Sequence, residues 1–177
     1  MNFALGKYNL LSTESPTIAG GDWLVGAPAT NVGTWALAES ARSVDLATAS
    51  TKITIDWGSA KTAQLLTFPR HNLSSTATIR WKRGTTAGAS DVADSTSLPA
   101  WLFTPRVFRG DVYEVIVVQA SSTSARYETI EIVDASNTGG YVDIGRVFIG
   151  EMFVPAVWQS YGAKDGHDDI SVVRQAK

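Results

Sequence analysis

Apolar and polar residues alternate with a period of two along much of the chain, and this pattern is typical of half-buried β-strands. The alternation is clearest in residues 52–58 and 76–82. The apolar faces of these two segments consist of Ile53, Ile55, Trp57, Ala77, Ile79 and Trp81. Asp56 and Gly58 suit a turn that ends the first strand. We therefore expect two strands that place their tryptophans in a core.

Three further segments predict strands. Residues 111–118 are rich enough in Val and Ile for a central strand that is covered on both faces. Residues 141–150 form a long apolar segment in which Gly145 indicates a bulge or a close backbone approach. In residues 127–133, one face carries Glu128, Ile130 and Ile132.

The segments between these strands read as connections. Residues 84–100 are small and polar, and they predict a long exposed loop. Residues 134–140 predict a tight turn between two strands. Residues 34–43 indicate a short helix.

Several short strands separated by turn signals predict an all-β sandwich or barrel. A chain of 177 residues is long enough for one domain with a sizeable core. We divide it into an N-terminal strand or arm at residues 1–20, a β-sandwich domain at residues 21–162 and a polar C-terminal arm at residues 163–177.

Composition excludes several classes of function. Lys and Arg number 15 against 17 Asp and Glu, so no basic excess indicates nucleic-acid binding. The absence of cysteine excludes disulfides, thiolate metal sites and cysteine nucleophiles. No apolar run approaches the roughly 20 residues of a membrane span. The first 16 residues lack the apolar segment of a signal peptide.

His71 is the first candidate for chemistry, because it is one of two histidines in the chain. A catalytic histidine needs a nucleophile or an orienting carboxylate, and Ser74 and Ser75 follow closely. No nucleophile-elbow motif is present, however. The alternative, which we favour, is that His71 and Asn72 close a turn, with the Asn72 side chain bound to local backbone.

Acidic residues offer two further candidates. Asp165, His167, Asp168 and Asp169 could ligate a metal, although their spacing is not that of a calcium loop and a solvated tail is the alternative. A glycosidase needs two carboxylates about 5 to 9 Å apart, and the sequence cannot pair any of its strand-borne acids. Those acids are Glu114, Glu128, Glu131, Asp143 and Glu151. No phosphate-binding, dinucleotide or zinc motif is present, so we expect no cofactor and no metal.

Aromatic residues are the candidates for ligand binding. The chain has six Trp and five Tyr, which either stack on the faces of sugars or fill the core of a sandwich. Four of them lie in segments that read as loops, and we take these as the candidate ligand-binding residues: Trp23, Trp35, Trp101 and Tyr161.

Two blocks of sequence carry a resemblance to a known family. In the first, an Arg-Ser pair at residues 42–43 precedes a strand that ends in Asp-Trp-Gly at residues 56–58, and a second strand ends in His-Asn-Leu-Ser at residues 71–74. The second block is Tyr-Val-Asp-Ile-Gly-Arg-Val-Phe-Ile-Gly at residues 141–150. Together they resemble the discoidin-like, galactose-binding-like jelly roll of virion proteins of tailed bacteriophages, over roughly residues 24–162.

This resemblance implies a jelly-roll β-sandwich of about eight antiparallel strands. It also implies that most of the recurring residues define the fold, with Asn72 capping a turn, Gly145 permitting close strand packing, and Arg42 or Arg146 pairing with Asp56 or Asp143. The recurring residues map to Arg42, Asp56, Gly58, His71, Asn72, Leu73, Arg126, Gly145 and Arg146. The sequence shows neither a calcium loop nor an obvious cluster of Arg and aromatic residues of the kind that sugar-binding members use.

The resemblance leads to a functional expectation, which is a non-enzymatic structural component of a phage tail tip or baseplate. Such a protein would form a homo-oligomeric ring around the tail axis with other tail and baseplate proteins. It would reside in the virion, and in the host cytoplasm during assembly. The alternatives are a lectin that binds a host-surface glycan through the four aromatic residues and, less favoured, a depolymerase of envelope glycans.

Overall fold

The computed structural model describes residues 5–6, 8–36, 38–101 and 115–153. Contacts divide the chain into a unit of residues 6–152 and a unit of residues 1–5 and 153–177, and most of the second lies outside the described residues. No helix of the described residues is long and apolar enough to span a membrane. The elements are β1 Leu5–Gly6, α1 Leu10–Thr13, β2 Thr17–Ala19, the 3₁₀ helix η1 Ala29–Gly33, β3 Ala41–Arg42, β4 Ile53–His71, β5 Thr78–Gly84, β6 Ala93–Pro99, β7 Val115–Val133, β8 Asp143–Gly150 and β9 Met152–Phe153.

One antiparallel sheet organises the unit of residues 6–152. Its strand order is β3-β8-β4-β7-β5-β6, and β2 pairs with β4 beside this path. β1 and β9 form a separate two-stranded sheet. The N-terminal segment therefore contributes a strand, β2, to the main sheet, and Leu10 and Leu11 of α1 join the hydrophobic core.

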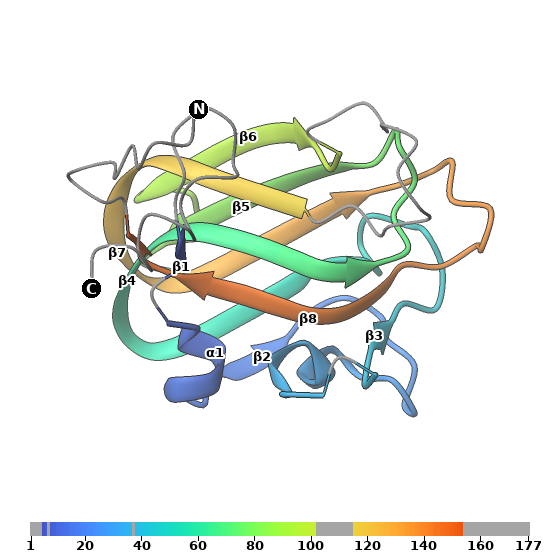
Figure 1. Ribbon diagram of the computed structural model, residues 1–177, viewed down its shortest axis with the longest axis horizontal. Helices are drawn as coiled ribbons and strands as arrows, with labels where there is room; N and C mark the ends of the chain where they lie inside the picture. Colours follow the sequence, from blue (N-terminus) through green and yellow to red (C-terminus); the bar gives the residue numbers. More distant parts are fainter. Residues whose placement is uncertain (1–4, 7, 37, 102–114, 154–177) are drawn as a thin grey trace, which may run out of the picture. The chain divides into compact units, whose positions relative to one another are not determined.

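The sheet folds over into two layers because β4 and β7 are each 19 residues long and curve back on themselves (Figure 1). The first half of β4 pairs with the second half of β7, and the second half of β4 pairs with the first half of β7. β5 and β6 extend the layer that holds the second half of β7, whereas β8 and β3 extend the layer that holds the second half of β4. The result is an all-β antiparallel sandwich.

Two interruptions of the β4–β7 ladder permit this curvature. Between the pairs Asp56–Tyr127 and Lys61–Ala125, four residues of β4 stand opposite one of β7. Farther along, residues 119–122 of β7 stand opposite one residue of β4, because Ala63 pairs with Thr123 and Leu65 with Val118. Extra residues of this kind bend the strand that carries them and increase its twist.

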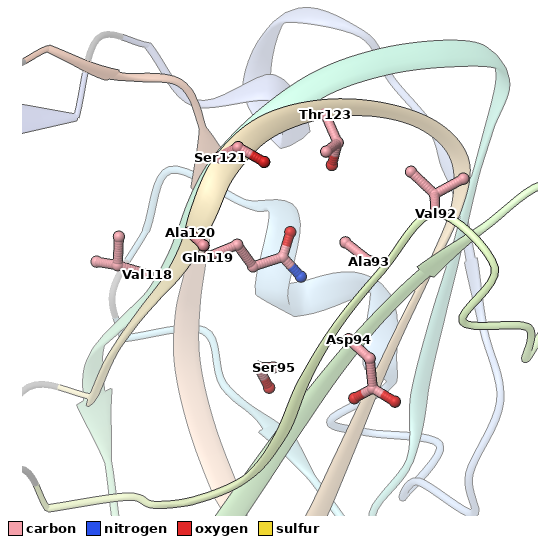
Figure 2. A pocket seen from close by; sticks show the side chains of 9 residues that line it. All are labelled: Val92, Ala93, Asp94, Ser95, Val118, Gln119, Ala120, Ser121 and Thr123. Atoms are coloured by element: carbon pink, nitrogen blue, oxygen red, sulfur yellow. The ribbon is translucent and has the colours of Figure 1, made fainter.

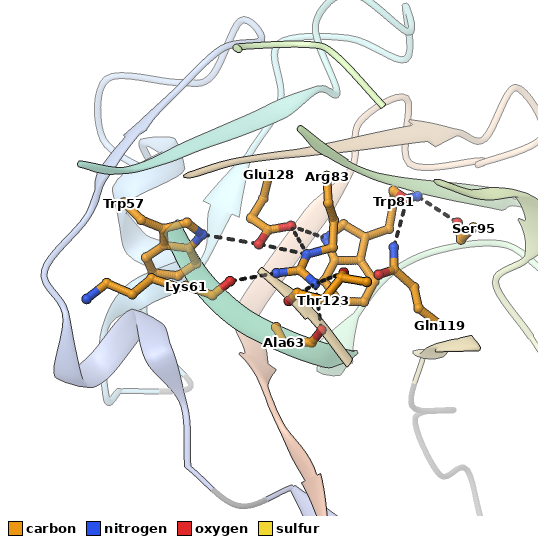
Figure 3. Close-up of polar contacts among 9 residues, drawn as sticks. All are labelled: Trp57, Lys61, Ala63, Trp81, Arg83, Ser95, Gln119, Thr123 and Glu128. Atoms are coloured by element: carbon orange, nitrogen blue, oxygen red, sulfur yellow. Dashed lines mark hydrogen bonds and ion pairs between the residues drawn. The ribbon is translucent and has the colours of Figure 1, made fainter. Parts of the chain in front are cut away.

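A buried ion pair holds the bend between these interruptions (Figure 3). Arg83 and Glu128 are both fully buried, and Nε of Arg83 donates to the two carboxylate oxygens at 3.0 and 2.9 Å. The indole N–H groups of Trp57 and Trp81 donate to the same carboxylate at 3.2 and 2.8 Å. Burial raises the pKa of Glu128 to about 7, while these four hydrogen bonds favour the ionised form.

The rest of the Arg83 guanidinium binds the backbone of both bent strands. Nη1 donates to the carbonyl oxygens of Ala63 and Thr123 at 2.6 and 2.8 Å, and Nη2 donates to the carbonyl of Lys61 at 2.9 Å. Buried carbonyl groups need donors, and a bulged ladder does not pair all of them. Arg83 therefore ties the backbone of β4 to that of β7 at the bend.

The hydrophobic core lies between the two layers, and the alternation in the sequence predicted its main residues correctly. Ile53, Ile55, Ile79 and Trp81 are almost completely buried, as is Ala77. The predicted bulge at Gly145 coincides with a register shift, since Arg70 pairs with Arg146 and His71 pairs with Ile144. The tight turn between β7 and β8 lies where residues 134–140 predicted it.

Four predictions of local structure were wrong. The strand that begins at Ile53 does not end at Gly58, which takes a φ of +73° inside the first interruption of β4. Residues 84–100 contain the edge strand β6 as well as a loop. Val118 is 45% exposed, so β7 is not covered on both faces there. The described part of residues 34–43 contains no helix, and the 3₁₀ helix η1 precedes it.

Candidate functional site

Trp35, which is exposed, pairs with Arg146 of β8, which is half-buried. Trp35 follows η1 and is 74% exposed. The guanidinium carbon of Arg146 lies 4.5 Å from the centre of its ring, which is within the range of a cation–π contact. Nη2 of Arg146 donates to the hydroxyl of Ser12 at 2.9 Å, so α1 fixes the arginine in this position. Nε of Arg146 is buried and has no hydrogen-bond partner among the described residues.

A second pair of an arginine and an aromatic residue lies where β3 meets the start of β8. The guanidinium carbon of Arg42 lies 4.3 Å from the centre of the Tyr141 ring. Nε and Nη2 of Arg42 donate to Oδ2 of Asp143 at 3.0 and 2.8 Å, and this hydrogen bond raises the pKa of Arg42. Nη2 of Arg70 lies 3.9 Å from Oδ1 of the same carboxylate.

The strand register brings these groups together on one face. Arg70 of β4 stands opposite Arg146 of β8, and Arg42 of β3 stands opposite Asp143. Residues directly opposite in an antiparallel pair share a face. We call Arg42, Arg70 and Arg146 the arginine strip. Within it Asp143 contacts two arginines, so the strip and Asp143 together carry more positive than negative charge.

Such a surface can bind a polar ligand with a flat apolar face. An exposed indole packs against the C–H groups of such a ligand, and guanidinium groups donate hydrogen bonds to hydroxyl or carboxylate oxygens. Two pairs of an arginine and an aromatic ring, Arg146 with Trp35 and Arg42 with Tyr141, include members of the arginine strip. The sequence had already indicated Trp35 as a candidate. It could not indicate that Arg146 packs on this ring, because the two residues are 111 positions apart in the chain.

The other candidate aromatics have different surroundings. The indole N–H of Trp23 donates to the carbonyl oxygens of Gly20 and Lys52 at 2.9 and 3.3 Å. That of Trp101 donates to the carbonyl of Leu73 at 3.1 Å. Both rings are partly buried and pack against the hydrophobic core. Tyr161 lies outside the described residues.

His71 and its neighbours form hydrogen bonds at a junction of the fold. Nδ1 of His71 accepts from the backbone N–H of Leu73 at 3.1 Å, and the Ser74 hydroxyl donates to Asp134. The sequence had suggested that the Asn72 side chain binds local backbone, and this prediction was wrong. The side chain donates to the carbonyl of Tyr141 at 2.9 Å and accepts from the N–H of Asp143 at 2.7 Å, which ties the end of β4 to the start of β8.

Other residues that recur in the resembled family also form contacts within the fold. Nε and Nη2 of Arg126 donate to the two oxygens of Asp56 at 2.8 and 3.0 Å, and Oδ1 of Asp56 accepts from the N–H of Gly58. Asp56 therefore pairs with Arg126 across the first interruption, whereas the sequence had suggested Arg42 or Arg146. The other suggested pair, Arg42 with Asp143, is present. Leu73 is buried in the core.

Among the described residues, the acidic candidates do not gather into a metal site. Glu128 is buried against Arg83, and Glu131 pairs with Lys82. Within residues 5–6, 8–36, 38–101 and 115–153, no three His, Asp or Glu side chains are grouped to hold a metal. Glu114 and the segment from Asp165 to Asp169 lie outside the described residues.

Comparisons with solved structures identify the fold. A family 32 carbohydrate-binding module of Clostridium perfringens NanJ in complex with galactose superimposes with a TM-score of 0.55 at 9% identity, over 85% of this chain and 100% of that chain. The lectin domain of lectinolysin in complex with Lewis B antigen gives 0.53 at 10% identity, over 86% and 100% of the two chains. The fold is a galactose-binding-like jelly roll.

Longer enzymes contain a similar domain. A GH29 fucosidase of Ruminococcus gnavus in complex with fucose gives a TM-score of 0.58 at 11% identity and covers 83% of this chain. This chain spans only about a quarter of the length of such fucosidase chains, 27% in this case. Neither a protein-family profile nor a curated protein sequence matches the chain. The neighbours thus include carbohydrate-binding modules and a lectin domain as well as glycosidase chains.

Proposed function

We propose that this chain is a non-enzymatic glycan-binding module that uses Trp35 and the arginine strip. The observation that carries the proposal is the 74% exposure of Trp35 with Arg146 against its ring. An exposed indole ring beside guanidinium groups offers a stacking surface and hydrogen-bond donors to the same ligand. Structural neighbours that carry galactose or Lewis B antigen add support from the fold.

A glycan array followed by calorimetric titration of the best glycan tests this proposal. Trp35→Ala should weaken binding at least tenfold, because it removes the stacking surface, whereas Trp35→Phe should retain most of the affinity. Arg126 provides a matched control for Arg146, since its guanidinium also lies over an aromatic ring, that of Tyr127, at 4.9 Å. Arg146→Ala should weaken binding and Arg126→Ala should not. Equal affinities of wild type and Trp35→Ala would refute the proposed site.

We further propose that the module acts as a structural component of a phage tail tip or baseplate, assembled as a homo-oligomeric ring and localised in the virion. The blocks around residues 42–74 and 141–150 resemble the jelly roll of virion proteins of tailed bacteriophages, and this resemblance supports the role. In the structure these blocks are adjacent, through Arg42–Asp143 and the Asn72 hydrogen bonds. Immunogold electron microscopy of intact virions tests the location, with label expected at the distal end of the tail. Label on the capsid, or no label, would overturn it.

A further inference from the structure

A pocket lies between the start of β6 and the second interruption of β7, on strands that carry none of the arginine strip (Figure 2). Its volume of about 370 Å³ is at the lower end of the range for small-molecule sites. This size limits the occupant to a single small molecule. The residues that decide its chemistry are Val92, Asp94, Val118, Gln119, Ser121 and Thr123.

Gln119 is the residue that points to a ligand. It is only 6% exposed, and its side-chain oxygen Oε1 has no hydrogen-bond partner among the described residues. The side-chain nitrogen donates to the carbonyl of Trp81 at 3.5 Å, which is at the limit of a hydrogen bond. Figure 2 shows the amide reaching in among the other pocket residues. Buried amide oxygens are normally paired, so this one lacks an expected donor. Because Oε1 exposes almost no surface, the amide must rotate before this atom can accept from an occupant of the pocket.

The second interruption of β7 explains why Gln119 is available. Residues 119–122 are the four residues of β7 that stand opposite a single residue of β4. Their backbone leaves the regular ladder, which opens space beside the edge strand β6. The backbone carbonyl of Gln119 is held by the side chain of Gln64 at 3.0 Å, so the residue is fixed while its own side-chain oxygen stays unpaired.

The rest of the lining selects a neutral ligand with hydroxyl groups. Asp94 is paired with Arg80 at 3.0 and 2.6 Å, and this contact lowers the pKa of Asp94. The lining includes the hydroxyl groups of Ser95, Ser121 and Thr123 but no Lys, Arg or His side chain, so it offers an anion no cation. The hydroxyls of Ser95 and Thr123 already accept from the backbone N–H of Trp81 and from Nη1 of Arg83, at 2.8 and 2.7 Å. Val92 and Val118 add aliphatic surface. Hydrogen-bond acceptors beside aliphatic groups suit a molecule with both hydroxyls and a C–H face.

We propose that this pocket binds one neutral saccharide residue, and that a hydroxyl of this residue donates to Oε1 of Gln119. The site is separate from Trp35 and the arginine strip. The choice of a saccharide over other polyols rests on the proposed glycan-binding function. The pocket and its unpaired acceptor are observed independently of that function.

NMR titration of the ¹⁵N-labelled protein with D-galactose, D-glucose and D-mannose tests the proposal, with glycerol as a polyol that lacks a ring. At least one hexose should shift the side-chain amide signals of Gln119 and the backbone signal of Ser121 at millimolar concentration. Gln119→Leu removes the acceptor, and Ala93→Leu fills the pocket without altering Gln119. Each should raise the dissociation constant at least tenfold, and Trp35→Ala should leave it unchanged.

The outcomes separate this site from the proposed function. Absence of any shift with the hexoses would mean that the pocket holds only water, and it would overturn the proposal. Equal dissociation constants for wild type, Gln119→Leu and Ala93→Leu would also overturn it. Equal shifts with glycerol would overturn the saccharide assignment. If Trp35→Ala abolishes glycan-array binding and leaves the hexose shifts intact, the two sites are independent, as proposed.

Discussion

Replacement of Arg83 by methionine should be among the most destabilising single substitutions in this protein. Methionine keeps much of the aliphatic volume but removes every hydrogen bond of the guanidinium. Glu128 would keep the two indole donors and lose its only charged partner among the described residues. The carbonyl oxygens of Lys61, Ala63 and Thr123 would lose their Arg83 donors at the same time.

The magnitude follows from burial. Removing one partner of a buried ion pair costs about 3–5 kcal/mol, because the other charge stays buried without compensation. Each buried carbonyl left without a donor adds about 1 kcal/mol or more. We therefore expect Arg83→Met to lower the free energy of unfolding by at least about 4 kcal/mol, against total stabilities of about 5–15 kcal/mol for single domains.

Urea denaturation followed by tryptophan fluorescence measures this loss, and its pH dependence adds a second test. Without Arg83 the folded-state pKa of Glu128 should rise beyond about 7, while the unfolded value stays near 4.5. A raised carboxyl pKa means that stability is present below the unfolded value and is lost as pH rises through the folded value. The deficit of Arg83→Met should therefore be larger at about pH 8 than at about pH 5.

Arg80→Met is the matched control, because Arg80 lies on the same strand and also binds a carboxylate, that of Asp94, but its side chain is 40% exposed. This control should cost less than about 1 kcal/mol. The double variant Arg83→Met/Glu128→Gln should recover part of the loss, since it removes the buried charge. A deficit for Arg83→Met no larger than that of Arg80→Met would refute the role assigned to the buried pair.

Three further predictions concern other positions. Arg126 holds the pKa of Asp56 at about 2, against an ordinary 3.8, so Asp56→Asn should remove a part of the stability that wild type loses as pH falls from about 4 through 2; identical acid-unfolding curves would contradict this. Asn72→Ala should cost about 1–3 kcal/mol in urea unfolding, because the bonds to Tyr141 and Asp143 are lost, and a neutral result would contradict the junction role. Gly21→Ala should cost at least about 2 kcal/mol by thermal unfolding, since Gly21 has a φ of +70° and an added Cβ would collide with Trp23, Ser50 and Lys52; an unchanged Tm would count against this.

Strand positions and core faces could be predicted because they depend on local alternation. Ile79 and Trp81 are buried for the reason that the pattern indicated. The edge strand β6 was missed because its sequence, Ala-Asp-Ser-Thr-Ser-Leu-Pro, has little β-propensity, and it is held by backbone pairing with β5. The continuation of β4 beyond Gly58 was missed because it depends on Arg83, more than twenty residues away.

The candidate site was predicted in part for a similar reason. Trp35 could be chosen because it lies in a polar, loop-like segment. Trp23 and Trp101 looked the same in sequence, but both rings pack against the hydrophobic core, and their indole N–H groups also bind the distant carbonyls of Lys52 and Leu73. The pairing of Arg146 with Trp35 depends on how β8 passes η1. Contacts between distant segments therefore decide which aromatic residues are free to meet a ligand.

The passage of β4 and β7 through both layers has a consequence for how the protein opens. Neither layer can detach while the other stays folded, because each would take half of a shared strand with it. Native-state hydrogen exchange should accordingly show the amides of Ile55, Leu66, Val117 and Ile130 exchanging with one common free energy, although they lie in different layers. The sandwich then behaves as a single folding unit, in which a substitution at the bend destabilises both layers equally.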